Sequence, residues 1–322
     1  MATRNTLRRA LLYIPGSSQR FIDKSRTLTA DCVAYDLEDS VTPHMKPEAR
    51  SLVRRALDQP APAGIRERAV RINSVDSGLA LGDLTEVLQS PNLTTLVVPK
   101  VNSPSDLTFV TDVITHTLSQ QQHLQGGASR PPISILALVE SAKSLTNLTQ
   151  ICASSPLLQG LIFAAEDFAL DLSLTRTPSL TEFLFARSAI VTAARAADLP
   201  STIDLVCTTY KSDKPGQAPA VLQEECRDGK RLGFNGKQCI HPTQVETAQA
   251  VFGPDLAEVT WAMRVVVADE KAAEAGRGAW TLDGKMIDVP VAGKARAIVS
   301  KAEACGFDVA GLRREWAGQE PE

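Results

Sequence analysis

The sequence has few histidines, no closely spaced cysteines and no long apolar run. Four histidines are scattered over 322 residues, and the six cysteines form no C-x-x-C pair, so the pattern of a zinc cluster is absent. Several cysteines lie inside apolar runs, which is typical of buried free thiols in a reduced, intracellular protein. No apolar run approaches the roughly 18–20 residues that span a bilayer. The sequence therefore predicts neither a zinc protein nor a membrane-spanning one.

The charge balance and the missing motifs exclude further classes. A formal net charge of −3 gives no electrostatic reason to bind DNA, RNA or an anionic membrane. No G-x-G-x-x-G follows the first apolar run, which counts against a dinucleotide-binding fold, and no phosphate-cradling P-loop is present. No Ser-His-Asp or Cys-His arrangement is recognisable. We therefore expect a small-molecule ligand and no nucleic acid.

The N-terminal segment bears on localisation. It is basic and free of acidic residues, and so weakly resembles an organelle presequence. The first expected strand already begins within it, which leaves no room for a removable peptide. The C-terminal sequence is no peroxisomal address. We expect a cytoplasmic protein, with a mitochondrial one as the alternative.

Short apolar runs rich in β-branched residues alternate with helical patterns. The expected strands are Arg8–Ile14, Cys32–Leu37, Ala69–Asn73, Thr95–Pro99, Ile133–Val139, Gly160–Ala164, Thr202–Val206 and Lys237–Ile240. The expected helices between them include Lys46–Leu57, Leu79–Gln89, Ser105–Leu118, Thr181–Ala197 and Ala220–Leu232. Strands separated by helical crossovers pair in parallel. Eight such units within about 250 residues predict an α/β fold of the (β/α)₈ TIM-barrel type.

Three segments depart from this alternation. Residues 119–132 are polar and rich in Gly and Pro, which predicts a solvated insertion, and residues 211–219 predict a long loop after the seventh strand. Beyond the barrel, a helix over 256–275 and a second over 294–305 predict a C-terminal helical arm. The predicted domains are thus a catalytic barrel at 1–250 and an arm at 251–322, which covers either its own barrel or a neighbour's.

Ionisable residues end nearly every expected strand, where barrel enzymes carry their active sites. Glu140 ends the fifth strand, and Glu166 and Asp167 end the sixth. Neighbouring strands lie about 4.8 Å apart, so these carboxylates can share one divalent ion. Oxygen-only ligands favour Mg²⁺, with Mn²⁺ as the alternative. The competing interpretation is that the carboxylates cap helices or pair with lysines.

Two cationic features have open interpretations. Arg71, inside an apolar alternation, is either a bidentate clamp for a carboxylate or enolate oxygen, or a counter-ion for Asp36 or Glu38. Arg20 and Lys24 follow a helix start on one helical face, which suits a phosphate group but also an ordinary solvated face. A histidine before proline, such as His241, is more often structural than a catalytic base.

The strand-end motifs resemble the citrate lyase β-subunit-like (HpcH/HpaI aldolase) family, which includes citramalyl-CoA and malyl-CoA lyases. The matching segments, in family order, are RRALLYIPGSS, AYDLEDSVTPHMKPEAR, VRIN, VPK, LVESA, GLIFAAEDFALDL, LGFNGKQCIHPTQ and DGKMIDVP. They extend almost from end to end of the chain. Two positions depart from the family pattern. Ala165 stands where many relatives carry glycine, and the loop after strand seven lacks the further aspartates often found there.

The resemblance implies a set of roles. Mg²⁺ would be bound by Glu140 and Asp167, and Arg71 would contact the thioester or carboxylate. The region of Arg20 and Lys24 would receive the phosphates of coenzyme A. Asp288, in the C-terminal arm, would be the acid/base residue that enters a neighbouring subunit's site. The other matched strand-end residues that we expect to bind the substrate or its CoA are Asp36, Glu38, Lys100 and Glu166.

The resemblance further implies Mg²⁺-dependent cleavage of a β-hydroxyacyl-CoA to acetyl-CoA and pyruvate or glyoxylate, in a homotrimer or a hexamer. Malyl-CoA thioesterase or malate-synthase-like chemistry would use the same groups. A citrate lyase β-subunit acting on a carrier-bound citryl thioester is a further alternative, although such subunits tend to lack the arm. A non-catalytic scaffold would have no need for Arg71, Glu140, Asp167 and Asp288 together.

Overall fold

The computed structural model describes residues 7–124, 132–212 and 217–322. The chain folds into two compact units. One consists of Arg8–Gln249, and the other is formed mainly by Ala250–Glu322. Each unit has its own hydrophobic core. No helix among the described residues is both long and apolar enough to cross a membrane.

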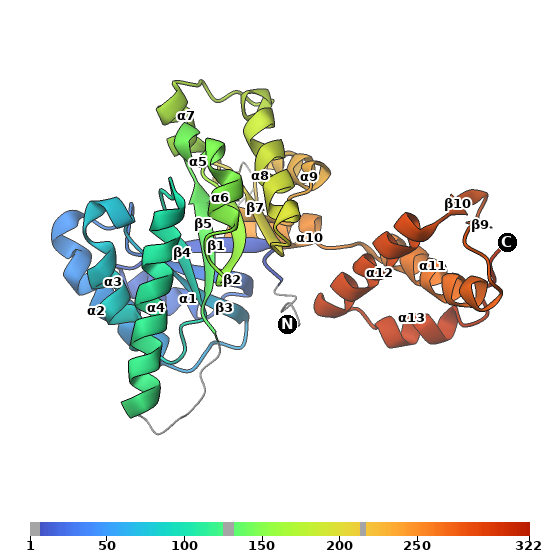
Figure 1. Cartoon of the computed structure of the whole chain (residues 1–322), viewed down its shortest axis with the longest axis horizontal. Helices are drawn as coiled ribbons and strands as arrows, with labels where there is room; N and C mark the ends of the chain where they lie inside the picture. The colour runs from blue at the N-terminus through green and yellow to red at the C-terminus, as the bar shows by residue number, and fades with distance from the viewer. Residues whose placement is uncertain (1–6, 125–131, 213–216) are drawn as a thin grey trace. The chain divides into compact units, whose positions relative to one another are not determined.

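The first unit is a closed barrel of eight parallel strands in sequence order (Figure 1). The strands are β1 (Ala10–Pro15), β2 (Ala30–Asp36), β3 (Ile65–Arg71), β4 (Thr95–Val98), β5 (Ser134–Val139), β6 (Leu158–Phe163), β7 (Ser201–Asp204) and β8 (Gly236–Cys239). Pairing of β1 with β8, with Leu11 opposite Gln238, closes the barrel. All eight predicted strands are present, which confirms the TIM-barrel prediction.

Helices follow the strands around the barrel. They are α1 (Gln19–Ser25), α2 (Lys46–Asp58), α3 (Ala80–Val87), α4 (Pro104–Leu124), α5 (Ala142–Thr146), α6 (Leu148–Cys152), α7 (Ala165–Leu172), α8 (Leu184–Ala196), α9 (Ala220–Leu232) and α10 (Thr243–Phe252). Single 3₁₀ turns occupy Pro43–Met45, Val75–Ser77 and Thr181–Phe183. The last of these begins the segment that was predicted as a continuous helix over 181–197.

The polar segment at 119–132 is only partly the loop that its composition predicts. Helix α4 continues to Leu124, so residues 119–124 are helical. Glutamine is a good helix former, and polarity alone did not distinguish an exposed helical end from a loop. The rest of that prediction, residues 125–131, lies outside the described residues, as do residues 213–216 of the predicted loop at 211–219.

The barrel interior is filled by small and branched apolar side chains. The cluster consists of Leu11, Cys32, Ala34, Ala69, Val97, Leu136, Leu138, Ile162 and Ile203, with Tyr13 and Ala164 packed against it. Five of the six cysteines are buried free thiols, as the apolar runs predict. At the opposite, amino-terminal end, Arg8 binds Glu67 through two hydrogen bonds of 2.6 and 2.7 Å. The interior is thus a packed core, and the cavities lie at its carboxyl end.

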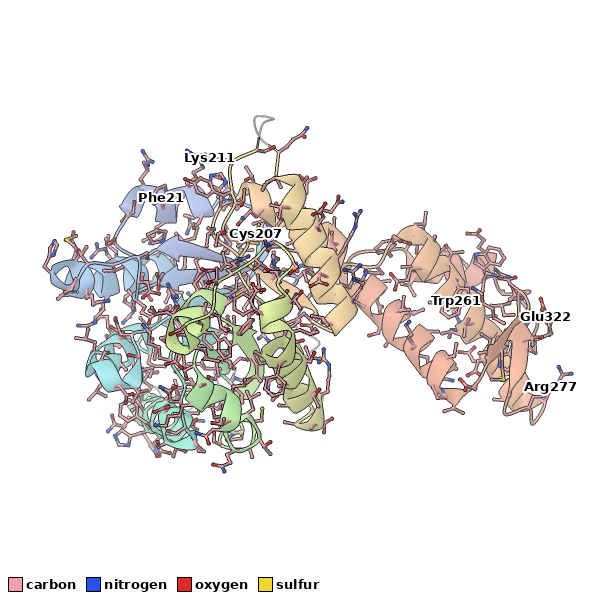
Figure 2. All side chains as sticks on the ribbon, turned by 90° about the horizontal axis from the view of Figure 1, so that it is seen from above. Phe21, Cys207, Lys211, Trp261, Arg277 and Glu322 are labelled. Carbon is pink, nitrogen blue, oxygen red and sulfur yellow. The ribbon has the colours of Figure 1, made fainter. Side chains whose placement is uncertain are left out.

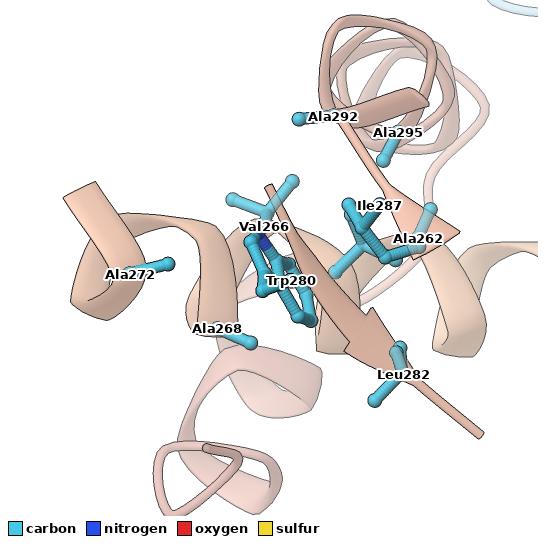
Figure 3. Packing of buried hydrophobic residues seen from close by; sticks show 10 residues of the cluster. Ala262, Val266, Ala268, Ala272, Trp280, Leu282, Ile287, Ala292 and Ala295 are labelled. Carbon is cyan, nitrogen blue, oxygen red and sulfur yellow. The ribbon is translucent and has the colours of Figure 1, made fainter. Parts of the chain in front are cut away.

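The second unit has two long helices joined through a β-hairpin, followed by a short third helix. It contains α11 (Leu256–Glu274), β9 (Trp280–Leu282), β10 (Lys285–Ile287), α12 (Val289–Ala304) and α13 (Val309–Glu315). Trp280, Leu282 and Ile287 of the hairpin pack on alanines of α11 and α12 (Figure 3). Helix α12 begins five residues before the predicted Lys294, because Asp288 caps it and a proline follows in its first turn.

Candidate active site

A cavity of about 500 Å³ opens at the carboxyl ends of the barrel strands. Its polar wall includes Tyr13, Asp36, Arg71 and Gln238 from β1, β2, β3 and β8. A second cavity of about 310 Å³ is lined by Lys100, Asn102, Glu140 and other polar residues. Asp167 lines both cavities. The fold therefore places charged residues at the carboxyl ends of the strands around two cavities, and the carboxylate of Asp167 lines both.

Local contacts fix the chain segments whose side chains form the polar wall of the larger cavity. Gly16 donates from its backbone nitrogen to the carbonyl of Asp36 at 2.8 Å, and a Cβ at this glycine would lie 2.5 Å from that oxygen. The buried Nζ of Lys46 donates to the carbonyl oxygens of Leu37 and Glu38, at 2.9 and 3.0 Å. Glycine after β1 and lysine at the start of α2 thus fix the segment that presents Asp36 and Glu38.

Glu140 and Asp167 are brought together at the second cavity. Glu140 follows β5, Asp167 lies in the first turn of α7 after β6, and the two strands are paired. The Glu140 side chain is buried, and its Oε2 has no hydrogen-bond partner. Burial, followed by the negative charges of Glu38 and Asp167, raises the pKa of Glu140 to about 8. A buried carboxylate oxygen without a partner, beside a second carboxylate, is costly unless a cation is bound there.

The donor set fits a hard divalent cation. Glu140 and Asp167 offer oxygen ligands only, which is the preference of Mg²⁺. Within the described ranges, no group of three or more His, Cys, Asp or Glu side chains lies close enough to hold a metal. Two protein carboxylates therefore leave the remaining coordination positions to water and substrate, as is usual for Mg²⁺.

Arg71 lies among three carboxylates. Its Nε and Nη2 donate to the two oxygens of Asp36 at 2.7 Å each, and its Nη1 lies 3.2 Å from Glu38 and 3.3 Å from Asp39. Its guanidinium also stacks 4.6 Å from the centre of the Tyr13 ring. Burial opposes the charge on Asp36, but the bonds and charge of Arg71 outweigh burial and lower the pKa of Asp36. Of the two predicted roles, the structure contains the counter-ion arrangement, and Arg71 still lines the cavity.

Lys100 pairs with Glu38 and lies near Asp39, the two carboxylates that face Nη1 of Arg71. Its Nζ donates to Glu38 at 2.9 Å and lies 3.9 Å from Asp39. The lysine backbone has φ of 51°, in the left-handed region that non-glycine residues rarely adopt. This conformation follows directly after β4 and Pro99, at the wall of the second cavity. Strain of this kind is concentrated at functional sites.

One positioning group was missed by the sequence reasoning. Arg176 contacts Glu166, donates to the carbonyl of Val206 at 3.1 Å, and binds Glu225 at 2.9 Å. Glu225 in turn lies 3.1 Å from the fully buried Lys237. Arg176 therefore ties the start of α7 to the segment after β7. It lies in a polar loop without periodicity, so nothing local in the sequence marks it.

The other predicted residues do not line either cavity. Asp204, which ends β7, likewise lies outside both linings, and its carboxylate accepts two hydrogen bonds from Arg187 at 3.1 and 2.7 Å. His241 shares a hydrogen bond with Thr243 and stacks on Tyr210, in keeping with a structural role.

Arg20 and Lys24 are exposed on α1, whose N-cap is Ser18. In Figure 2, Cys207 lies inside the barrel unit, and Phe21 and Lys211 lie at its edge. Asp288 belongs to the second unit, where it caps α12.

An eight-stranded parallel barrel with charged residues at its carboxyl ends places this chain among the TIM-barrel enzymes. Residues 9–242 match the family model for HpcH/HpaI aldolase/citrate lyase, and the chain belongs to that family of carbon–carbon lyases. This confirms the resemblance that the strand-end motifs indicate.

Similar proteins extend the comparison over nearly the whole chain. The mitochondrial citramalyl-CoA lyase of Homo sapiens is 34% identical over 304 residues, which cover 92% of this chain and 85% of the relative. The citrate lyase subunit beta of Escherichia coli K12 is 36% identical over 302 residues, which cover 93% and 95%. The crystal structure of Mycobacterium tuberculosis CitE, in complex with magnesium, acetoacetate and coenzyme A, matches with a TM-score of 0.71 at 26% identity, and the match covers 93% and 99%.

Proposed function

We propose that this chain is a Mg²⁺-dependent lyase that cleaves citramalyl-CoA or malyl-CoA to acetyl-CoA and a 2-oxo acid, pyruvate or glyoxylate. One observation carries the proposal: the partnerless, buried Oε2 of Glu140, in a cavity wall that also contains Asp167. The citramalyl-CoA lyase relative and the magnesium- and coenzyme A-bound structure of the CitE protein support it.

Glu140 and Asp167 would hold the metal. When bound, Mg²⁺ (or Mn²⁺) supplies Lewis-acid chemistry that acidifies the acyl hydroxyl and polarises the carbonyl that forms from it. The acidified hydroxyl gives its proton to solvent water, and the electron pair of its O–H bond forms this carbonyl as the adjacent carbon–carbon bond breaks. The electron pair of that bond passes to the thioester fragment as an acetyl-CoA enolate. Arg71, fixed in place by Asp36, stabilises the enolate charge as it develops.

Asp288 completes the reaction by donating a proton to the enolate carbon, and in reverse it accepts that proton. We assign it to the site of a neighbouring subunit, in a trimer or a dimer of trimers. Arg20 and Lys24 receive the phosphates of coenzyme A, while Glu38, Lys100 and Glu166 bind or orient the acyl group. If light scattering showed that the protein is monomeric while it retains full activity, Asp288 could not act in a neighbouring subunit.

The test is the release of acetyl-CoA from citramalyl-CoA and from malyl-CoA, each with Mg²⁺ and with EDTA. Metal-dependent release of acetyl-CoA, with a matching amount of 2-oxo acid, supports the lyase. Release of free coenzyme A thiol without acetyl-CoA would instead indicate a thioesterase. Inactivity on both thioesters, together with co-purification of an acyl-carrier protein, would move the function to a carrier-bound citryl substrate.

A further inference from the structure

The first turn of α7 contains a proposed metal ligand but has no side-chain cap. Helix α7 begins at Ala165, and the side chain of its N-cap residue, Ala164, makes no capping hydrogen bond. Glu166 and Asp167 follow in that first turn. A first turn without a side-chain cap is less stable than a capped one, because its backbone N–H groups lack that partner. The position of Asp167 therefore depends on the contacts that other side chains of the turn make.

Arg176 supplies such a contact from beyond the other end of the same helix. Helix α7 ends at Leu172, and its C-cap, Ser173, adopts a left-handed backbone with φ of 56°. The chain then turns back, and Nη1 of Arg176 donates to Oε1 of Glu166, ten residues earlier. The beginning of α7 is thus held by a residue of the segment that follows the helix.

The remaining contacts of Arg176 lie in the barrel wall. Nη1 also donates to the carbonyl oxygen of Val206 at 3.1 Å, and Nη2 donates to Oε1 of Glu225 at 2.9 Å. The other carboxylate oxygen of Glu225 lies 3.1 Å from Nζ of Lys237, a fully buried residue of β8. A planar guanidinium that is bonded to three partners has one orientation. The barrel wall therefore fixes Arg176, and Arg176 fixes Glu166.

Building on the metal site of the proposed function, we propose that Arg176 is a positioning residue for Mg²⁺ binding. It holds Glu166 against the barrel wall, and the same helical turn then presents Asp167 to Glu140 across the second cavity. Without this contact the turn is free to move, and the two carboxylates must be brought together when the metal binds. Arg176 is not among the described residues that line the two cavities, so it acts through Glu166 rather than on the metal.

The sign of the effect distinguishes positioning from charge. Removing a cation beside Glu166 leaves more negative charge near the metal site, which by itself strengthens the binding of Mg²⁺. This charge effect is weak, because the Glu166 side chain is 55% exposed and is screened by water and salt. Loss of an outer contact that orients a metal ligand acts in the opposite direction and typically lowers metal affinity about 10–100-fold. We therefore expect weaker binding of Mg²⁺.

Calorimetric titration of Mg²⁺ alone into the full-length protein tests this role without turnover. Arg176→Ala should raise the dissociation constant about tenfold, the lower end of the usual effect of such contacts. Arg176→Lys keeps the charge but loses the planar fork, so its dissociation constant should lie between those of the wild type and Arg176→Ala. At saturating Mg²⁺, both variants should release acetyl-CoA with a kcat close to that of the wild type.

Unchanged or tighter Mg²⁺ binding in Arg176→Ala would overturn the proposal while leaving the lyase function intact. If the alanine variant does not fold, Arg176→Lys decides the question in the same way. A wild-type protein that binds no Mg²⁺ would instead remove the metal site of the proposed function.

A control and a double variant separate positioning from lost stability. Arg195 donates to the carbonyl oxygens of Leu199 and Gly233, at 3.0 and 3.2 Å, just before β7 and β8 begin. Arg195→Ala should therefore lower the melting temperature without changing the dissociation constant of Mg²⁺. Glu166→Ala should weaken Mg²⁺ binding, and Arg176→Ala with Glu166→Ala should weaken it no further than the larger single change, because contacting residues are not additive. A double variant that multiplies the two single effects would overturn the route through Glu166.

Discussion

The guanidinium of Arg71 and the carboxylate of Asp36 form two parallel hydrogen bonds of 2.7 Å at the carboxyl ends of β3 and β2. The backbones of the same two residues are register partners in the sheet. Sheet pairing and side-chain pairing therefore reinforce each other, and the arginine is held before a substrate arrives. Preorganised donors of this kind stabilise developing charge at little cost of reorganisation.

Arg71→Lys should lower kcat/KM about 10²–10³-fold, because lysine keeps the charge but loses the planar pair of donors. The measurement is steady-state acetyl-CoA release. Arg54→Lys, at a partly exposed ion pair with Asp58 away from both cavities, is the control and should leave the rate unchanged. Full activity of Arg71→Lys would show that the bidentate geometry is dispensable.

Glu140→Gln should abolish the Mg²⁺-dependent rise in melting temperature while stabilising the metal-free protein. The amide replaces a buried, partnerless carboxyl group that must either hold a proton well above its ordinary pKa or bear an unpaired charge, and it also removes a metal ligand. In the wild type, Mg²⁺ at 100 times its dissociation constant should add about 2.7 kcal/mol of stability. Thermal unfolding with Mg²⁺ and with EDTA gives both quantities. The control Glu48→Gln, at an exposed residue, should keep the Mg²⁺-dependent rise in melting temperature. The same rise in Glu140→Gln would show that Glu140 is not a metal ligand.

Asp288→Asn should abolish cleavage without unfolding the second unit. Asp288 accepts the backbone N–H of Val291 at 3.1 Å as the N-cap of α12, and asparagine caps a helix about as well as aspartate does. Asp288→Ala should in addition lose about 1 kcal/mol of stability. Activity and urea unfolding of the two variants separate acid/base chemistry from capping. Wild-type cleavage by Asp288→Asn would exclude the catalytic role.

The Arg8–Glu67 pair should make the barrel sensitive to acid. Burial opposes the charge on Glu67, but Arg8 outweighs burial and lowers the pKa of Glu67 below its usual 4.5. The stabilisation is therefore present above about pH 4.5 and is lost as the pH falls through the folded-state pKa. The unfolding free energy of Glu67→Gln should change less between pH 7 and pH 3 than that of the wild type. An identical pH dependence in urea titrations would contradict this.

The barrel and its charged rim could be predicted because they depend on local patterns. Apolar runs of four to seven residues, most of them closed by an ionisable residue and separated by helices, predict a parallel sheet, because that arrangement buries the runs. The hairpin Trp280–Ile287 carried a usable signal that was missed. Asp283 and Gly284 both have positive φ, as the Asp-Gly dipeptide of a two-residue hairpin turn requires.

The pattern of partners was decided only by the tertiary structure. The sequence by itself determined that Arg71, Glu140 and Asp167 lie at or shortly after the carboxyl ends of strands, since strand ends follow from local periodicity. It left open whether Arg71 is paired, and it gave no sign that Arg176 holds Glu166 and the segment after β7. It also did not bring Leu138, Ala164 and Val206 into the lining of one cavity. These relationships join residues distant in the chain, and closure of the barrel is what brings their side chains within contact distance.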